Sequence, residues 1–176
     1  KNKVKILRLH NYFFKTKEKL EKKINPFISN LNNYALVLHT SGTTSKPKMV
    51  AITHKNLLSS ANNISAALKL TKRDKNIILM PSFHIHGIIA SILSPLYMGG
   101  KVVALSKFNV LTFYNSLEIH KPTWFTAVPT MLQSIIDRSK NNIKIIKENK
   151  LRFIRSSSAS LPANTFKALE KIFNVP

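Results

Sequence analysis

Nine consecutive residues, Thr40 to Lys48, gather side chains that suit a phosphate-binding loop. The segment contains five hydroxyl side chains, one glycine and two lysines, and no acidic residue lies between Glu21 and Asp74. Hydroxyl and backbone N–H groups donate hydrogen bonds to phosphate oxygens, and lysines add positive point charges. The composition therefore predicts a loop that binds an anionic ligand, with a polyphosphate as the favoured class.

The surroundings of this loop differ from those of a Walker A loop. A Walker A loop has two glycines separated by four residues, then Lys and Ser or Thr at the start of a helix. Here one glycine is present, and Pro47 lacks the N–H that a continuing helix needs. The apolar runs 34–38 and 49–52 on either side indicate two short buried strands. The sequence predicts a strand–loop–strand unit that can close over a ligand.

Two later segments carry further polar groups at strand ends. Pro81 to Gly87 contains His84 and His86 and follows an apolar run over 77–80. Ligands of open α/β sheets bind beyond the carboxyl ends of strands, so His84 is well placed for one. A metal pair at His84 and His86, or a core histidine bonded to a backbone carbonyl, are the alternatives. Arg155 to Leu161 supplies small side chains between a strand and a helix, as many serine-rich connections do.

Strands and helices alternate along the rest of the chain. This order predicts an α/β fold with a mostly parallel sheet flanked by helices, in a domain over 34–176 that follows a basic polar segment, 1–33. Thr53 and Asn109 are expected to cap helices, and Pro129 to open one. The expected strands are 34–39, 49–52, 77–80, 102–105, 123–127 and 151–155. The expected helices are 15–23, 54–68, 87–97, 110–120, one from Pro129, and 162–173, with Ser160 or Leu161 near the cap of the last.

Composition narrows the classes of function. The 176 residues carry a net charge of +21 and no cysteine, which excludes disulfides and thiol chemistry. The chain is also rich in asparagine, with 17 residues, and this joint bias toward lysine and asparagine affects exposed positions in general. The bias accounts for the positive charge, so nucleic acid is not an expected partner. A basic, non-catalytic binding module is the alternative. No apolar run reaches the roughly 20 residues of a membrane helix, and the lysine-rich start differs from a secretory signal.

Thr40 to Val50 resembles the signature loop of the AMP-forming adenylating enzymes. This superfamily comprises acyl-CoA synthetases, luciferases and the adenylation domains of peptide synthetases. Its pattern is [Ser/Thr]-Ser-Gly-Thr-Thr-Gly-x-Pro-Lys-Gly-Val, from which this chain departs at Ser45 and Met49. Residues 81–87 resemble the superfamily's Pro-x-Phe-His-x-x-Gly element, and residues 156–161 its Ser-Gly-Gly-Ala-Pro-Leu segment. The His-x-His-Gly arrangement is similar to the oxalate–CoA ligase branch, within a group like the 4-coumarate–CoA ligases.

The resemblance implies an acyl-CoA synthetase that uses ATP, magnesium and CoA on a carboxylic acid. His84 would border the acid and act as the catalytic residue. Ser157, Ser158 and Ala159 would lie along the adenine. The β- and γ-phosphates of ATP would be held by Thr40, Ser41, Gly42, Thr43, Thr44 and Lys48. A peptide-synthetase or luciferase-like adenylation domain is the alternative within the superfamily.

Three features of the superfamily have no counterpart in these 176 residues. They are the Tyr-Gly-x-Thr-Glu segment with its magnesium-binding glutamate, the ribose-binding aspartate, and the small C-terminal domain. We therefore expect an incomplete piece of the large N-terminal domain, with the magnesium ligand elsewhere in the parent protein. On its own the piece is expected to be inactive. The compartment stays open at this point, with an intracellular protein, cytoplasmic or peroxisomal, as the expectation.

Overall fold

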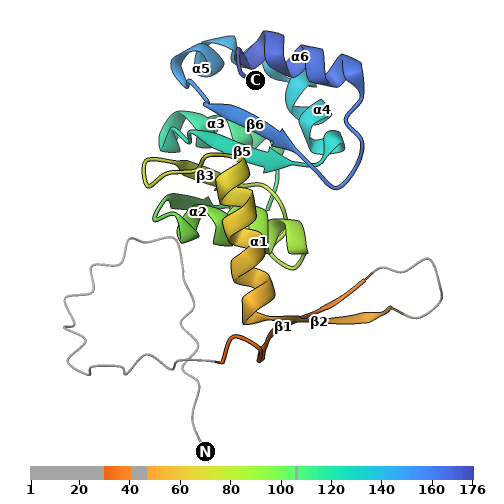
Figure 1. Ribbon diagram of the computed structural model, residues 1–176. Helices are drawn as coiled ribbons and strands as arrows, with labels where there is room; N and C mark the ends of the chain where they lie inside the picture. Colours follow the sequence, from red (N-terminus) through yellow and green to blue (C-terminus); the bar gives the residue numbers. More distant parts are fainter. Residues whose placement is uncertain (1–29, 41–46, 106) are drawn as a thin grey trace, which may run out of the picture.

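A four-stranded parallel sheet forms the centre of the computed structural model, which describes residues 30–40, 47–105 and 107–176 (Figure 1). Its strands are β3 (Lys75–Ile78), β4 (Lys101–Ala104), β5 (Trp124–Ala127) and β6 (Phe153–Ser156), in the order β4-β3-β5-β6. Register pairs Ile77 with Phe125, and Phe125 with Ile154. The expected α/β fold with a mostly parallel sheet is confirmed.

Helices cover both faces of this sheet because alternate residues of a strand point in opposite directions. Ile77 and Phe125 pack into the main core with four helices: α3 (Val110–His120), α4 (Pro129–Asp137), α5 (Ile143–Glu148) and α6 (Ala163–Phe173). Asn76 and Thr126 face the other side, where they bond to the helix η1 (His86–Leu93). The helices α1 (His54–Ala67) and α2 (Ser94–Tyr97) pack against η1 on that side.

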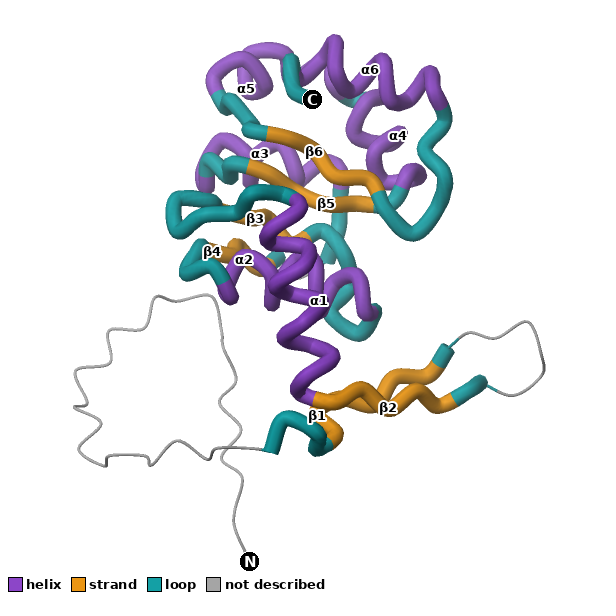
Figure 2. Tube along the Cα trace, in the orientation of Figure 1, coloured by secondary structure: helices purple, strands orange, loops and turns teal. Residues whose placement is uncertain are grey.

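The first two strands form a separate antiparallel hairpin, β1 (Tyr34–His39) with β2 (Met49–Thr53), that projects from the start of α1 (Figure 2). The prediction that both strands are buried is wrong. Tyr34 is 73% exposed and Met49 is 70% exposed, and only Leu36, Leu38, Ile52 and Thr53 are half-buried. A two-stranded ribbon has no second layer of its own, and within the described residues little packs against its faces.

Local signals in the sequence placed most helix ends correctly. Thr53 caps α1 through a reciprocal pair of hydrogen bonds with Asn56, and Asn109 caps α3 through the N–H of Leu111. Pro129 opens α4 as expected. Gly99, at φ 72°, ends α2, where the N–H of Gly100 bonds to the Pro95 carbonyl in a Schellman motif. Pro162, rather than Ser160 or Leu161, is the capping residue of α6.

Three expected elements have clearly different bounds in the structure, and one of them is the strand expected over 151–155, which is β6 at 153–156. The strand expected over 77–80 runs from Lys75 to Ile78. Leu79 and Met80 lie beyond its end but are still buried, and for this reason the sequence pattern extended the strand over them. The helix expected over 87–97 begins at His86 and is a π-helix for eight residues before α2 continues it. The 3₁₀ turn η2 (Ser139–Asn142) lies between α4 and α5. The helix expected over 15–23 lies outside the described residues.

A charged network joins the amino ends of the strands. The Arg152 guanidinium donates to both oxygens of Asp74 at 3.0 Å, and Thr123 donates to Asp74 at 2.9 Å. Burial acts to raise the pKa of Asp74, but hydrogen bonds from Thr71, Arg152 and Thr123 outweigh it and hold that pKa below its usual range. The network ties the starts of β3, β5 and β6 together. Among the described helices, none has the length and apolar character needed to span a membrane.

Candidate functional site

A cluster of four polar side chains lies where β5 and β6 end: His86, Thr126, Arg155 and Ser158. His86 is the first residue of η1 and is 9% exposed. Its Nε2 lies 2.7 Å from the Thr126 hydroxyl, and its Nδ1 lies 3.0 Å from the Ser158 hydroxyl. Arg155 is the register partner of Thr126, and its Nη1 lies 3.1 Å from the Thr126 hydroxyl and 3.3 Å from His86 Nε2. Segments that are distant in sequence thus meet at the carboxyl ends of β5 and β6.

The donors and acceptors of this cluster fix its protonation. Arginine only donates, so the contact with Arg155 requires His86 Nε2 to act as an acceptor. The remaining proton is then on Nδ1 and is donated to the Ser158 oxygen. Burial, together with the nearby Arg155 charge, lowers the pKa of His86 to about 4. The imidazole is therefore neutral at physiological pH, Arg155 carries the positive charge, and the Ser158 hydroxyl can donate its own proton outward.

The serine-rich connection after β6 brings Ser158 to the cluster at a conformational cost. Ser158 has φ 74°, in the left-handed region that favours glycine. A strained residue that persists at a polar cluster indicates a functional constraint. The N–H of Ser157 bonds to the Ala127 carbonyl at 3.2 Å and extends the pairing of β5 with β6. Ser158 and Ala159 are exposed, so the three residues predicted to lie along an adenine form an accessible, small-residue loop.

Close packing holds His86 in place at the start of η1. A Cβ atom on Gly87 would stand 2.1 Å from the Pro81 carbonyl oxygen, a distance that no side chain tolerates. Glycine is therefore required at this position, because the first turn of η1 lies directly on the backbone of residues 80–81. Gly87 thus allows close packing, and this packing fixes the position of His86, the residue before it.

His84, the predicted catalytic residue, lies apart from this cluster. It is exposed, and its ring centroid lies 4.5 Å from that of Phe83. A pocket of about 380 Å³ brings it together with Thr40 and with apolar hairpin residues, among them Leu38 and Val50. Two predicted site residues that are 44 positions apart thus share one cavity.

The base of the predicted phosphate loop is closed by Thr40 and Lys48. The N–H of Thr40 donates to the Lys48 carbonyl at 2.9 Å, and both residues are exposed. The four predicted phosphate-binding residues between them, Ser41, Gly42, Thr43 and Thr44, lie outside the described residues. Of the two ends of the loop, Thr40 lines the pocket that also contains His84.

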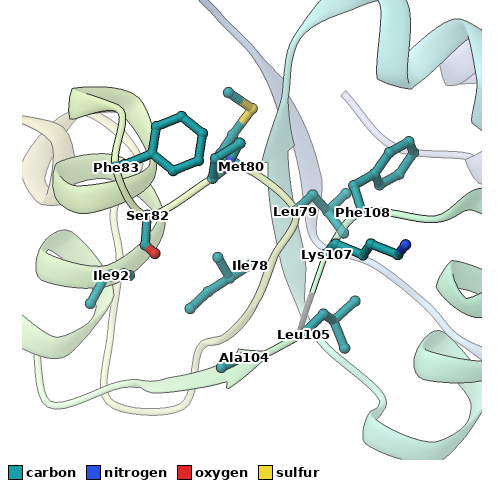
Figure 3. A pocket seen from close by; sticks show the side chains of 11 residues that line it. Ile78, Leu79, Met80, Ser82, Phe83, Ile92, Ala104, Leu105, Lys107 and Phe108 are labelled. Carbon is teal, nitrogen blue, oxygen red and sulfur yellow. The ribbon is translucent and has the colours of Figure 1, made fainter.

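A second hollow of about 370 Å³ opens at the carboxyl ends of β3 and β4 (Figure 3). Figure 3 shows Met80 and Phe83 on one side and Leu79, Phe108 and Lys107 on the other. Apart from Lys107 and Ser82, its side chains are apolar. The Arg155 cluster is therefore better suited to a charged ligand than this hollow is. No group of three or more acidic or histidine side chains suited to a metal ion occurs in the described part of the chain.

Sequence reasoning missed that His86, Thr126 and Arg155 come together in one cluster. A histidine that opens an apolar run, here 87–93, must be buried and needs polar partners, which was an available signal. Arg155, a charged residue inside the strand predicted over 151–155, was a second available signal. Thr126 offered none, because threonine is an ordinary strand residue. The structure joins Ser158, one of the predicted residues, to His86 instead of to His84.

The fold and the candidate site define a class: an α/β domain with a polar cluster at the carboxyl ends of parallel strands, where such folds bind their ligands. A family described as "AMP-binding enzyme" matches residues 4–176, and the chain belongs to this family. The matched range includes most of the basic segment 1–33.

Characterised relatives include the oxalate–CoA ligase of Arabidopsis thaliana, 46% identical over 144 residues, or 81% of this chain and 28% of the relative. The oxalate–CoA ligase of Saccharomyces cerevisiae is 39% identical over 86% of this chain and 27% of its own. A solved malonyl-CoA ligase, bound to methylmalonyl-CoA and AMP, aligns with a TM-score of 0.75 at 29% identity, over 82% of this chain and 32% of that one. The chain thus spans less than a third of the length of these relatives.

Proposed function

We propose that the protein containing this chain is an AMP-forming acid–thiol ligase, and that its acid is a short dicarboxylate such as oxalate. The cluster of Arg155, Thr126, His86 and Ser158 is the observation that carries the proposal. It places one unpaired guanidinium and one outward-donating hydroxyl at the sheet edge, and no carboxylate of the described residues pairs with Arg155. The names of the relatives, oxalate–CoA and malonate–CoA ligases, support the same substrate class.

The reaction has two steps in this proposal. A carboxylate oxygen of the acid forms a bond to the α-phosphorus of ATP, and the bond from that phosphorus to pyrophosphate breaks. The sulfur of CoA then bonds to the acyl carbon, AMP leaves with the former carboxylate oxygen, and the thiol proton passes to solvent. The chain's own residues contribute by positioning and by neutralising charge.

The distal carboxylate is the part of the acid that the Arg155 cluster would bind. Arg155 supplies charge that Thr126 and the neutral His86 orient, and Ser158 donates a hydrogen bond. Because His86 is neutral, it adds no second charge that would bind monocarboxylates and anions indiscriminately. The reacting carboxylate would then point toward the nucleotide.

The nucleotide would lie between the hairpin and the serine-rich connection. Thr40 and Lys48 frame the predicted phosphate loop, and Ser157 and Ala159 leave space for a flat base to approach the backbone. His84, which shares a pocket with Thr40, would border the reacting acid. Magnesium would accompany the ATP, and we expect its protein ligand to lie elsewhere in the parent protein, since the described residues hold no acidic cluster for it.

Acid-dependent ATP–pyrophosphate exchange by the full-length protein tests this proposal. Oxalate should be compared with acetate, and malonate with propionate, since each pair differs chiefly in the second carboxylate. We expect exchange with a dicarboxylate at a rate at least roughly tenfold above its matched monocarboxylate, the discrimination that one hydrogen-bonded charge provides. Exchange with monocarboxylates alone, or with no acid at all, would contradict the proposal.

A further inference from the structure

Ser158 presents its hydroxyl at the surface of the Arg155 cluster. The residue is exposed, and its Oγ accepts a hydrogen bond from His86 Nδ1 at 3.0 Å, so the hydroxyl hydrogen points outward. The two serines before it differ, because Ser156 Oγ is buried and Ser157 is half-buried with its N–H bonded to the Ala127 carbonyl. Ser158 is thus the first serine after β6 whose oxygen a modifying enzyme can reach.

The backbone on the far side of Ser158 is held by few hydrogen bonds. Among the described residues, the N–H groups of Ser158, Ala159 and Ser160 have no hydrogen-bond partner, and all three residues are exposed. The next element, α6, begins only at Ala163. Exposed loops of small, polar residues open at little cost in free energy, and they are where enzymes act most readily on folded proteins. Opening would also relieve the left-handed φ of 74° at Ser158.

The groups beside this hydroxyl suit a phosphoryl group. Arg155 and Ser158 contact the two different nitrogens of the same imidazole, at 3.3 and 3.0 Å. Within the described part of the chain, no carboxylate pairs with Arg155. A phosphoserine carries a charge of about −1.5 to −2 at pH 7 and three strong acceptor oxygens, and near an arginine it forms charge-assisted hydrogen bonds. The Nδ1–H of His86 and the Arg155 guanidinium would be the donors.

We propose that Ser158 is a phosphorylation site, and that its phosphoryl group blocks the Arg155 cluster by pairing with Arg155. In the modification, Ser158 Oγ bonds to the γ-phosphorus of an ATP held by a protein kinase, and the bond from that phosphorus to ADP breaks. The hydroxyl proton passes to the catalytic aspartate of the kinase. The cluster then changes from a positive to a negative net charge and repels a dicarboxylate. This effect on activity rests on the proposed function, whereas the pairing with Arg155 does not.

The pairing is tested on the full-length protein with phosphoserine placed at position 158 during translation. Phosphoserine at position 160 is the matched control, because Ser160 is exposed in the same connection and makes no hydrogen bond to His86 in the described structure. ³¹P spectra recorded over a range of pH measure how tightly each phosphoryl group binds its last proton. We expect this binding to be at least about threefold weaker at 158, because Arg155 stabilises the dianion.

Arg155→Met should remove that difference between the two positions. Equal proton binding at 158 and 160 in the protein with Arg155 would overturn the inference.

Acid-dependent ATP–pyrophosphate exchange measures the effect on activity. Phosphoserine at 158 should lower the oxalate-dependent kcat/KM at least about 100-fold, and phosphoserine at 160 should leave it within about threefold of the unmodified protein. If proton binding is weaker at 158 but the oxalate-dependent kcat/KM is unchanged, the pairing is upheld. The assignment of the Arg155 cluster to a dicarboxylate is then overturned instead.

Two substitutions keep the inference testable if the protein with phosphoserine at 158 does not fold. The side chains of Ser158→Asp and Ser158→Asn have nearly the same size, and both residues tolerate a positive φ, so the variants differ chiefly in one negative charge. We expect the oxalate-dependent kcat/KM of Ser158→Asp to be at least about tenfold below that of Ser158→Asn. Equal values would overturn the blocking of the cluster by charge.

Phosphopeptide mapping of the full-length protein, purified from its own cells grown with and without oxalate, tests whether the modification occurs. A phosphate mapped to Ser158 would support the inference. Ser158 unmodified under both conditions would overturn it.

Discussion

Two arginines three residues apart, one just before the last strand and one within it, lie toward opposite ends of the sheet and have opposite environments. Arg152, at the amino ends, bonds to both oxygens of the buried Asp74. Arg155, at the carboxyl ends, hydrogen-bonds within the described residues to a hydroxyl and an imidazole, both uncharged. A charge with a built-in counter-ion belongs to the structure, whereas a half-buried charge without one is suited to a counter-ion from outside. The comparison separates the structural end of the sheet from the end that we propose binds the ligand.

The largest effect on stability is expected from breaking the structural pair. Arg152→Met should lower the free energy of unfolding by about 3 kcal/mol, because Asp74 remains buried without its counter-charge. Thermal or urea unfolding of the full-length protein measures this. The preference for dicarboxylate over monocarboxylate should not change. A lost preference in the folded variant would show that the two ends of the sheet are not separate.

The pH dependence of stability tests the ligand-binding end. The pKa of His86 is lowered to about 4 in the folded state. Between pH 6.5 and pH 4 the imidazole therefore binds a proton in the unfolded state but not in the folded state. The stability due to this group is therefore fully present above pH 6.5 and is lost as the pH falls toward 4. Between pH 7 and pH 5 the loss should be about 2 kcal/mol. His86→Gln should reduce the pH dependence by that amount, and an unchanged slope would mean that His86 is not held neutral.

The smallest effect concerns the left-handed Ser158. Ser158→Gly and Ser158→Ala both lose the hydroxyl bonded to His86, but only glycine relieves the backbone. The glycine variant should be more stable than the alanine variant by about 1 kcal/mol, measured by urea unfolding. Both variants should lose activity on a dicarboxylate by roughly fivefold, in step with one hydrogen bond. Equal stability of the two would contradict the strain at this position.

Local features of the sequence predicted more of this molecule than its long-range features did. The caps at Thr53 and Asn109 and the proline start of α4 depend on residues a few positions apart, and all were predicted correctly. The burial of β1 and β2 was not, because an apolar run looks the same whether another layer covers it or not. The AMP-binding family was evident from the loop and the Pro81–Gly87 segment, and the family match confirms it.

The site shows the same limit. The pattern singled out His84, while the structure places His86 at the centre of a hydrogen-bonded cluster. That cluster combines residues 86, 126, 155 and 158, and no local pattern reports on contacts across 72 positions. A hydrogen bond from Asn76 to the Ser91 carbonyl likewise joins two elements. Chemistry that depends on two strands and a helix meeting becomes visible only once their register is known.

The measurement that tests the central claim most directly compares Arg155→Met with the wild type on oxalate and on acetate, by ATP–pyrophosphate exchange in the full-length protein. We expect the variant to lose at least about 100-fold of its oxalate-dependent kcat/KM, since truncating one partner of a buried charge pair costs that much. Its acetate-dependent kcat/KM should stay within about threefold of the wild type. An equal loss on both acids, or no loss on oxalate, would contradict the assignment of Arg155 to the second carboxylate.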